Sequence, residues 1–288
     1  MDGCAGGGIE KFFYPGGPVV TSTTYRVMQY NITHQKEGWT WIPELFEIPF
    51  EERAANVANV IKQINPDVVL LSERFEEWAG IDTGAVAMEN GGVNLIDLLG
   101  DSYGIAGDTI THNGETVVNR VPIVYNSSKL KLVDSGVVVL TDEYPFDRSQ
   151  NKRAATWAIF EDLSTGNRFA VFNAHWSIQE YNGNSLAETR KQQSKEMQAL
   201  INDERFKDMP RIAGGDFNSQ YHFDILQELL TNCGLTHADM AVNGEITWDS
   251  VDHIGIAGAE IKDYKDWRFD NASDHPPIHV DFTITTTN

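Results

Sequence analysis

Residues 210–218 read PRIAGGDFN, an apolar run that ends in two glycines, an acid, an aromatic residue and an amide. We interpret this segment as a short strand running into a loop, so that Asp216 and Asn218 directly follow the strand. Strand ends are where a rigid scaffold meets solvent and where functional sites are usually built. A carboxylate after a single strand is nevertheless more often a solvated turn or cap. This segment therefore indicates a functional site only if other strands end in the same way.

Five further apolar segments carry polar side chains of the same kinds at one end. Asn31 follows RVMQY, Glu73 ends VVLLSE, His175 follows FAVFNA, Asp252 opens DHIGIAG, and Asp274 and His275 precede PPIHV. Hard oxygen ligands without a thiolate suit Mg²⁺ or Mn²⁺ rather than zinc. Two histidines beside free carboxylates can also supply proton transfer and orientation around a phosphoryl group. The pattern therefore indicates one shared site for a divalent cation and a phosphate ester.

Strand and helix patterns alternate along the chain. Residues 51–64 carry an apolar stripe at helical spacing, formed by Val57, Val60, Ile61 and Ile64. Residues 67–73 form a continuous apolar run that is typical of a strand covered on both faces. Residues 164–167, Ser-Thr-Gly-Asn between two β-rich runs, indicate a hairpin.

The second half of the chain adds two clear helices. Residues 185–201 predict a helix with Ser185 as N-cap and Glu188 completing a capping box. Another helix ends at Gly234, and Cys233 within it is expected to be a core thiol. Strand-rich halves interrupted by helices predict an α/β (α+β) fold in which two packed sheets carry helices on their outer sides.

One domain is predicted over residues 25–285, after a flexible tail over residues 1–24 that is rich in Gly, Pro, Ser and Thr. A length of 288 residues is within reach of one large two-sheet domain. No stretch approaches the ~18 apolar residues of a membrane helix, and no signal peptide is recognisable. Cys4 stands before small residues, as at a lipid-attachment site, but no apolar segment precedes it. We expect a soluble monomer and leave its compartment open, including a secreted or surface protein whose signal has been removed.

The charge balance restricts the class of substrate. The chain has 22 basic and 42 acidic residues, a net charge of −20. Such a chain repels nucleic acid at long range unless a basic patch or bound cations reverse the local field. No cluster of Lys and Arg with interleaved aromatic residues is present, so the sequence shows no dedicated nucleic-acid groove.

Six short motifs together resemble the endonuclease/exonuclease/phosphatase superfamily. They are YNI, LLSE, NAHWS, GGDFNS, VDHI and SDHPPI, in this order, and the resemblance covers residues 25–284. The pair GDFN and SDH, with D-x-I between them, is its most specific part. The resemblance implies the pancreatic-deoxyribonuclease-like fold, a four-layered sandwich of two mostly antiparallel sheets flanked by helices. It also implies a divalent-metal-dependent hydrolase of phosphate esters.

The resemblance implies particular roles for the residues around the metal and the attacking water. Glu73 would be the principal metal ligand with Asn31 beside it, and Asp274 would support the metal or a second cation. Asp216 would position or deprotonate the water, and Asn218 would hold a phosphoryl oxygen.

Further roles concern the phosphate and the rest of the substrate. His275 would contact the phosphate and be oriented by Asp252, while His175 would contact the phosphate or assist the leaving group. Arg153 matches a position where the family often has an arginine near the substrate. Trp176, next to His175, either floors a substrate pocket by stacking or packs in the core.

The chain departs from the family pattern without losing a catalytic functional group. Ser72 stands where glutamine is usual, Ala174 stands where threonine is common, and His253 replaces an aromatic residue. We expect His253 to be a packing or surface histidine rather than a ligand. The substrate stays open: a small or medium phosphoester is the first interpretation, a nuclease the second, and a catalytically inactive binding module of the same fold the third.

Overall fold

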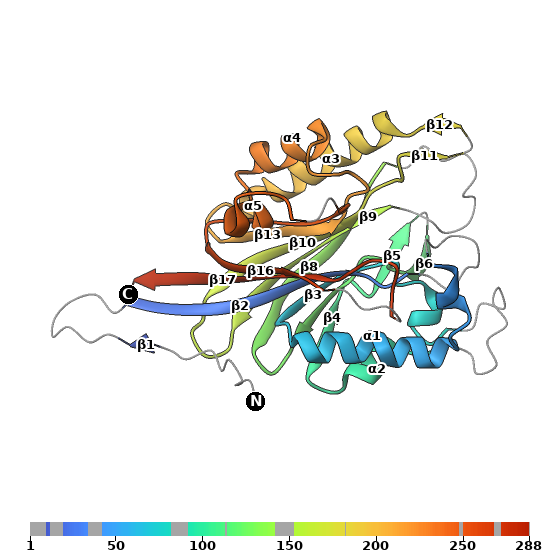
Figure 1. Ribbon diagram of the computed structural model, residues 1–288. Helices are drawn as coiled ribbons and strands as arrows, with labels where there is room; N and C mark the ends of the chain where they lie inside the picture. Colours follow the sequence, from blue (N-terminus) through green and yellow to red (C-terminus); the bar gives the residue numbers. More distant parts are fainter. Residues whose placement is uncertain are drawn as a thin grey trace.

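The computed structural model describes residues 10–11, 20–33, 42–81, 92–112, 114–141, 153–181, 183–247, 250–267 and 272–287. Two β-sheets, which we call sheet I and sheet II, are stacked in the middle of the molecule (Figure 1). In the view of Figure 1, helices α1 and α2 lie below the sheets, and α3 and α4 lie above them. These four layers confirm the predicted sandwich of two mostly antiparallel sheets flanked by helices.

Sheet I has the strand order β16–β17–β2–β3–β7–β4, and β1 pairs with β2. The bounds are Glu10–Lys11 (β1), Val20–Asn31 (β2), Val68–Ser72 (β3), Tyr103–Ala106 (β4), Ile123–Asn126 (β7), Glu260–Asp266 (β16) and Ile278–Thr287 (β17). Neighbouring strands are antiparallel except β2 and β3, which are parallel. The carboxyl ends of β2 and β3 therefore lie side by side, with Asn31 opposite Ser72.

Sheet II has the order β14–β15–β13–β10–β9–β8. The bounds are Leu130–Val139 (β8), Ala154–Asp162 (β9), Arg168–His175 (β10), Arg211–Asp216 (β13), Thr236–His237 (β14) and Asp252–Ala257 (β15). Strands β9 and β10 form the predicted hairpin around residues 164–167. Strands β10 and β13 are parallel, so their carboxyl ends also lie side by side, with His175 opposite Asp216.

Within the described residues there are also two short hairpins and three 3₁₀ helices. They are β5 (Thr109–His112) with β6 (Glu115–Val118), β11 (Glu180–Tyr181) with β12 (Asn184–Ser185), η1 (Pro43–Phe46), η2 (Glu76–Trp78) and η3 (Glu204–Phe206).

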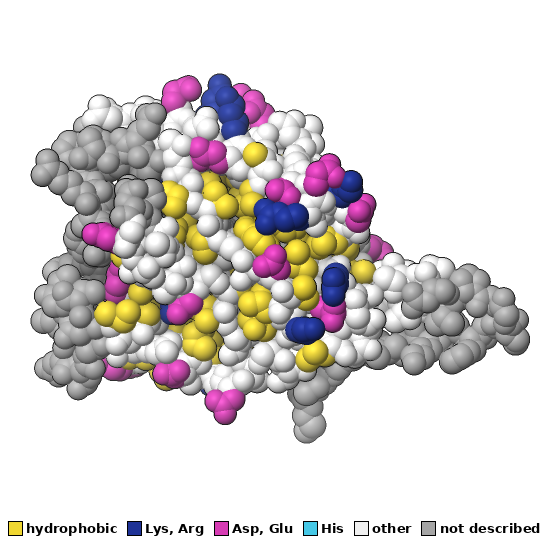
Figure 2. Space-filling model, turned by 180° about the vertical axis from the view of Figure 1, so that it is seen from behind, with side chains coloured by type: hydrophobic (Ala, Val, Ile, Leu, Met, Phe, Trp, Pro, Cys, Tyr) yellow, Lys and Arg dark blue, Asp and Glu magenta, His cyan; other side chains and the backbone are white. Residues whose placement is uncertain are grey.

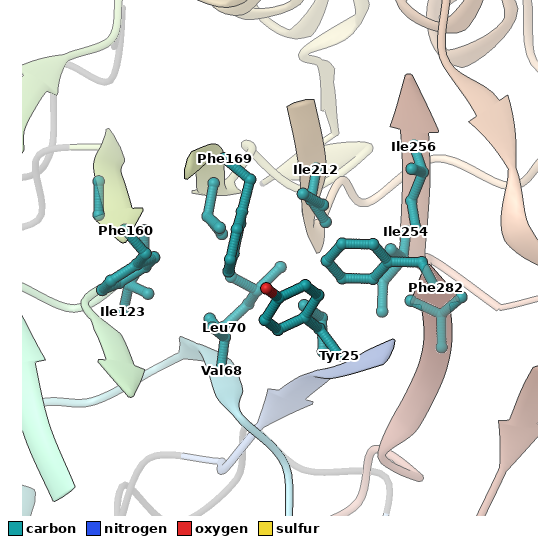
Figure 3. Packing of buried hydrophobic residues seen from close by; sticks show 14 of the residues in the cluster. Tyr25, Val68, Leu70, Ile123, Phe160, Phe169, Ile212, Ile254, Ile256 and Phe282 are labelled. Atoms are coloured by element: carbon teal, nitrogen blue, oxygen red, sulfur yellow. The ribbon is translucent and has the colours of Figure 1, made fainter. Parts of the chain in front are cut away.

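The main core fills the space between the two sheets (Figure 3). Tyr25, Leu70 and Phe282 of sheet I meet Phe169 and Ile212 of sheet II. The rings of Tyr25 and Phe169 lie 4.9 Å apart between centroids. Because side chains alternate along a strand, the core residues of a long strand lie two apart, as Val68 and Leu70 do in β3.

Helix α1 (Phe50–Ile64) covers the outer face of sheet I with the predicted apolar stripe, since Val57, Val60, Ile61 and Ile64 are all buried. Val69 and Leu71 of β3 belong to the cluster under α1, whereas Val68 and Leu70 belong to the inter-sheet core. Strand β3 is thus covered on both faces, as predicted. The short helix α2 (Leu95–Leu99) adds Leu95 and Leu99 to the cluster under α1.

The outer cluster of sheet II involves α3 (Ala187–Ile201) and α4 (Asp224–Cys233), and α5 (Ala238–Asn243) follows β14. Helix α4 ends at Gly234 in the left-handed conformation, and Cys233 is buried, both as predicted. The predicted capping box of α3 is wrong. Leu186 is the N-cap residue, because Ser185 belongs to the short hairpin strand β12. Ser185 contacts the start of the helix through its hydroxyl group, which accepts a hydrogen bond from Ala187 N at 3.3 Å.

The predicted tail extends too far into the domain. Residues 20–24 belong to β2, which pairs with β17 as far as Val20 opposite Thr287. Hydroxyl pairs at 2.9 Å join Ser22 to Thr285 and Thr24 to Thr283, so the threonine-rich ends of the chain support each other as strands. None of the described helices is long and apolar enough to cross a membrane.

Candidate active site

The inter-sheet core changes from apolar to polar toward one end of the sandwich. In β2 the inward residues run from Tyr25 and Val27 to Gln29 and Asn31, and in β10 they run from Phe169 and Val171 to Asn173 and His175. Ile212 is followed on the same face of β13 by Asp216, and Ile254 of β15 by Asp252. The candidate site is therefore the polar end of the layer that holds the sheets together.

Asn31 links the two sheets at this end. Its Nδ2 donates to Glu73 Oε1 at 3.1 Å and to Asp216 Oδ2 at 3.0 Å. Its Oδ1 accepts a hydrogen bond from the backbone N–H of Thr33 at 3.0 Å, which fixes the orientation of the amide. From sheet II, His175 Nε2 approaches Asp216 Oδ2 at 3.4 Å. Asp216 is thus contacted from both sheets.

Asp252 and His275 form a second part of the site. His275 Nδ1 and Asp252 Oδ2 are 2.6 Å apart, and Gln29 Nε2 donates to Asp252 Oδ1 at 3.1 Å. Burial lowers the pKa of His275, but Asp252, with help from Asp216 and Asp274, raises it well above its ordinary value. Burial also opposes ionisation of Asp252, yet the charge of His275 leaves the pKa of this carboxyl lowered. The pair is therefore charged at neutral pH.

Asp216 has the opposite electrostatic situation. Its side chain is buried, and burial followed by the charge of Asp252 raises its pKa to about 7. His275, the backbone N–H of Asn218 and the amide of Asn31 act in the lowering direction without overcoming these effects. A carboxyl group with a pKa near neutrality is suited to exchange a proton with water.

Glu73, His175 and Asp216 are the described group that best fits a metal ion. They offer one ligand atom each, and these atoms lie within 4.8 Å of one another. The two carboxylates supply oxygen donors that suit Mg²⁺ or Mn²⁺, whereas the imidazole nitrogen is a donor that softer divalent ions prefer. A cation beside Asp216 would also offset the burial and repulsion that oppose its ionisation. Asp216, Asp252 and His275 meet the same distance limit, but there the His275–Asp252 hydrogen bond already engages two of the ligand atoms.

Two residues predicted to support a metal make other contacts. Asn31 presents its amide nitrogen to the carboxylates, so in this arrangement it orients Glu73 and Asp216 as a donor. Asp274 Oδ1 accepts a hydrogen bond from the Thr33 hydroxyl, and its backbone N–H donates to the same hydroxyl at 3.2 Å. The ligand roles of Asn31 and Asp274 stay predictions.

Backbone strain is concentrated at the site. Four described residues other than glycine have positive φ, and three of them, Thr33 at 54°, Glu73 at 63° and Asn218 at 46°, lie here. The fourth, Asn65, caps α1. Such conformations cost on the order of 1–3 kcal/mol each and persist where the surrounding structure imposes them, commonly at functional sites.

The substrate-binding prediction for Trp176 is wrong. Its side chain is 0% exposed and stacks against Phe217, with ring centroids 4.5 Å apart. Trp176 continues the outward-facing series of β10 with Phe172 and Ala174, whereas His175 points to the opposite face. Arg153 is partly buried and its carbonyl accepts from Leu140 N at 2.8 Å, so its substrate role stays a prediction.

The sequence analysis missed several polar residues that support the site. Gln29 is completely buried and bridges Asp252 to Ser72 across the two sheets. Asn173, also completely buried, donates to the carbonyl oxygens of Leu71 at 2.7 Å and Pro122 at 3.0 Å. A signal for both was present, because Gln29 and Asn173 each lie two residues before a predicted site residue and so on the same strand face.

A third acidic and histidine group, Asp263, His279 and Asp281, lies on β16 and β17. Trp267 Nε1 donates to His279 Nδ1 at 2.7 Å, so the ring proton is on Nε2 and neither nitrogen offers a lone pair to an ion. Asp281 is also paired with Arg26 Nε at 2.7 Å. This group is therefore structural, and His279 is a buried packing histidine.

The chain has the fold of the endonuclease/exonuclease/phosphatase family. An endonuclease/exonuclease/phosphatase family protein from Bacteroides thetaiotaomicron is 18% identical, with a TM-score of 0.68 over 91% of this chain and 96% of that chain. The human Nocturnin catalytic domain with bound sulfate is 19% identical, with a TM-score of 0.66 over 92% and 95%. A mannosyl-6-phosphatase from Bacteroides thetaiotaomicron is 17% identical, with a TM-score of 0.64 over 90% and 99%.

At these identities the similarity shows the fold alone. The reaction is therefore inferred from the residues of this chain. No protein-family model matches the sequence, and no curated protein matches it.

Proposed function

We propose that this protein is a divalent-metal-dependent phosphoesterase that hydrolyses a phosphate mono- or diester by attack of water. The observation that carries the proposal is the position of Asp216. This carboxyl belongs to both residue groups, Glu73–His175–Asp216 and Asp216–Asp252–His275. A base, a cation site and an imidazolium in one cluster are the parts that phosphoryl transfer to water requires. Proteins of the same fold include a mannosyl-6-phosphatase.

The residues of the site divide the work of the proposed reaction between cation binding, proton transfer and charge stabilisation. Glu73, His175 and Asp216 hold a Mg²⁺ or Mn²⁺ ion, which when bound supplies Lewis-acid stabilisation of the phosphoryl oxygens. Asp216 also orients the attacking water and accepts its proton. The charged His275, held by Asp252, stabilises the negative charge that develops on the phosphoryl group.

Asn218 contributes a hydrogen bond to the substrate. Its Nδ2 donates to the carbonyl of Trp176 at 2.9 Å, and the amide group carries a second N–H for a phosphoryl oxygen. The Trp176 carbonyl thereby fixes the direction of this amide, although the Trp176 ring itself lies in the core.

The charges on the surface favour a small substrate over long nucleic acid. On the face shown in Figure 2, Lys and Arg side chains lie singly among Asp and Glu side chains. Several described surface cations are engaged by acids: Arg168 by Glu161 at 2.5 Å, Arg205 by Asp203 at 2.9 Å and Lys262 by Glu260 at 2.6 Å. Binding of a long polyanion needs several such cations to contact phosphates. Recognition of one phosphoryl group needs only the site and its ion.

The test is a hydrolysis panel with Mg²⁺, with Mn²⁺ and with EDTA. It should contain sugar phosphates, a chromogenic phosphodiester, a dinucleotide, sphingomyelin, oligo-RNA and plasmid DNA. We expect kcat/KM on a small ester to match or exceed that on duplex DNA and to be abolished by EDTA. Raising the salt from about 50 to 200 mM should change the small-ester rate far less than the roughly 10³-fold loss of multi-phosphate binders.

Two outcomes would replace this proposal. Plasmid cleavage with a steep salt dependence and no hydrolysis of small esters would establish a nuclease. Absence of hydrolysis throughout the panel, with the protein folded and metal present, would favour a binding module.

A further inference from the structure

The loop that follows Asp216 and carries Asn218 is held by side chains that the proposed reaction does not use. From α3, Arg190 Nη1 donates to the Asn218 carbonyl at 2.6 Å and to Ser219 Oγ at 2.8 Å. From β15, His253 Nε2 lies 2.8 Å from the Ser219 carbonyl oxygen. Two consecutive carbonyl groups of the loop are therefore bound by two different elements.

The loop after Asp216 turns sharply at Asn218. Asn218 has φ at 46°, in the left-handed region that most side chains avoid and that asparagine tolerates better than most. The backbone N–H of Asn218 donates to Asp216 Oδ1 at 2.9 Å, and the Asn218 side chain is directed by the carbonyl of Trp176. A change in the backbone at Asn218 would therefore displace both functional groups together.

The protonation states behind the loop follow from the hydrogen-bond partners. A carbonyl oxygen only accepts, so His253 Nε2 carries a proton and donates to Ser219. His253 Nδ1 lies 3.0 Å from His237 Nε2. In a neutral His253 ring Nδ1 then has no proton and accepts from His237 Nε2, and the unprotonated His237 Nδ1 lies buried without a hydrogen-bond partner. The result is a directional chain from His237 through His253 to the loop.

The family resemblance leads us to expect an aromatic residue at position 253, and phenylalanine there would fill the same space but lack the donor. The His253 ring is 3% exposed and lies parallel to Phe217, 16° between planes, so its packing resembles that of an aromatic residue. The difference is the N–H directed at Ser219. Position 253 is thus occupied by a side chain that can both pack and hold the loop.

We propose that His253 is a positioning residue for Asp216 and Asn218, and that His237 fixes the tautomer that makes it a donor. The catalytic consequence rests on the proposed phosphoesterase function, whereas the tautomers and the hold on the loop do not.

The kinetic test compares two replacements at position 253. His253→Phe keeps a planar ring without the donor, and we expect kcat to fall by about 10-fold or more with little change in KM, because a buried carbonyl loses its partner. His253→Gln retains an N–H donor and should recover most of the rate. His222→Phe, at an exposed histidine, is the matched control and should leave kcat unchanged.

Coupling to the loop separates positioning from a merely structural role. In an Asn218→Ala background the further loss from His253→Phe should be clearly smaller than in the wild type, because the two residues act on one feature. The proposal would be overturned if the fold-losses in kcat of the two single variants simply multiply in the double variant. It would also be overturned if His253→Phe has the same kcat as the wild type.

Nuclear magnetic resonance of the ¹⁵N-histidine-labelled full chain tests the proposal without any hydrolysis. At pH 7 we expect His253 and His237 to be neutral, each with its proton on Nε2, and His253→Phe to alter the amide resonances of residues 218–219. A proton on His253 Nδ1, or unchanged resonances in the loop, would overturn the inference even in an active enzyme. An inactive protein with the expected tautomers would reject the proposed function and keep the chain of histidines.

Discussion

Strand β3 has a carboxylate at each end, and the two ends are built differently. Asp67, before the strand, accepts hydrogen bonds from Lys129 Nζ and from the Arg26 backbone N–H, each at 2.8 Å. Its negative charge is compensated by a cation in direct contact. This end of the sandwich is complete without any further group.

Glu73, after the same strand, lies in contrasting surroundings. It receives the Asn31 amide at 3.1 Å and shares a candidate ligand group with His175 and another carboxylate, Asp216. Its backbone is also strained, at φ of 63°. The comparison separates the two acids by their surroundings: Asp67 is paired with a lysine of the fold, whereas Glu73 lies among the side chains that we propose to hold a cation.

The largest expected effect of a substitution near the Glu73 end of β3 is on kcat. Asp216→Asn removes the base and a metal ligand, so kcat should fall by about 10³-fold or more. The folded protein should be no less stable at pH 8, because burial and Asp252 raise the pKa of Asp216 to about 7 and its ionised form is disfavoured in the fold. Kinetics and thermal unfolding measure both. A variant that keeps its rate would remove Asp216 from the mechanism.

A smaller loss is expected from the charged pair beside the cation site. Asp252→Asn should lower kcat by about 10²-fold, far more than it changes KM, because the imidazolium of His275 matters most as charge develops. The penalty should overlap with that of His275→Ala. Strictly additive losses in the double variant would show that the two residues do not act as a unit.

The opposite end of β3 should affect stability alone. Asp67→Asn keeps the shape but removes the charge beside Lys129, which should cost about 1 kcal/mol and lower the Tm by a few degrees. Its kcat should equal that of the wild type. Thermal unfolding and steady-state kinetics measure this contrast, and a large loss of rate with unchanged Tm would reverse the comparison.

The smallest effect concerns acid stability. Burial lowers the pKa of His237 to about 3, whereas an exposed histidine titrates near 6.5. Below about pH 6.5 the unfolded chain binds a proton that the folded chain does not, so stability present above this pH is lost as the pH falls toward 3. His237→Phe should therefore flatten the decline in Tm between pH 7 and pH 5. Parallel curves of Tm against pH for the wild type and His237→Phe would show that a group other than His237 causes the decline.

The fold was largely predictable because its elements follow hydrophobic periodicity. In α1 the spacing of the apolar residues predicts which face is buried, and in β3 the uninterrupted apolar run predicts burial on both faces. The errors arose where local signals competed with long-range pairing: residues 20–24 look like a tail but pair with β17, and Ser185 looks like a cap but belongs to a hairpin.

The candidate site was predictable in its membership and less so in its geometry. Strand ends identified the segments that meet at the polar end of the core, since strand register aligns His175, Asp216 and Asp252. Strand alternation would also have placed Trp176 in the core, opposite to His175. The direction of the Asn31 amide could not be predicted, because it depends on the N–H of Thr33 in a strained backbone conformation.

Calorimetric titration of Mg²⁺ into wild type, Glu73→Gln and Asp67→Asn tests the difference between the two ends of β3 most directly. We expect the wild type and Asp67→Asn to bind Mg²⁺ alike, and Glu73→Gln to bind at least about 10-fold more weakly while remaining folded. At pH 7, binding to the wild type should release a fraction of a proton, because a cation lowers the raised pKa of Asp216. Equal Mg²⁺ affinity in folded Glu73→Gln, or a loss of affinity confined to Asp67→Asn, would contradict the account.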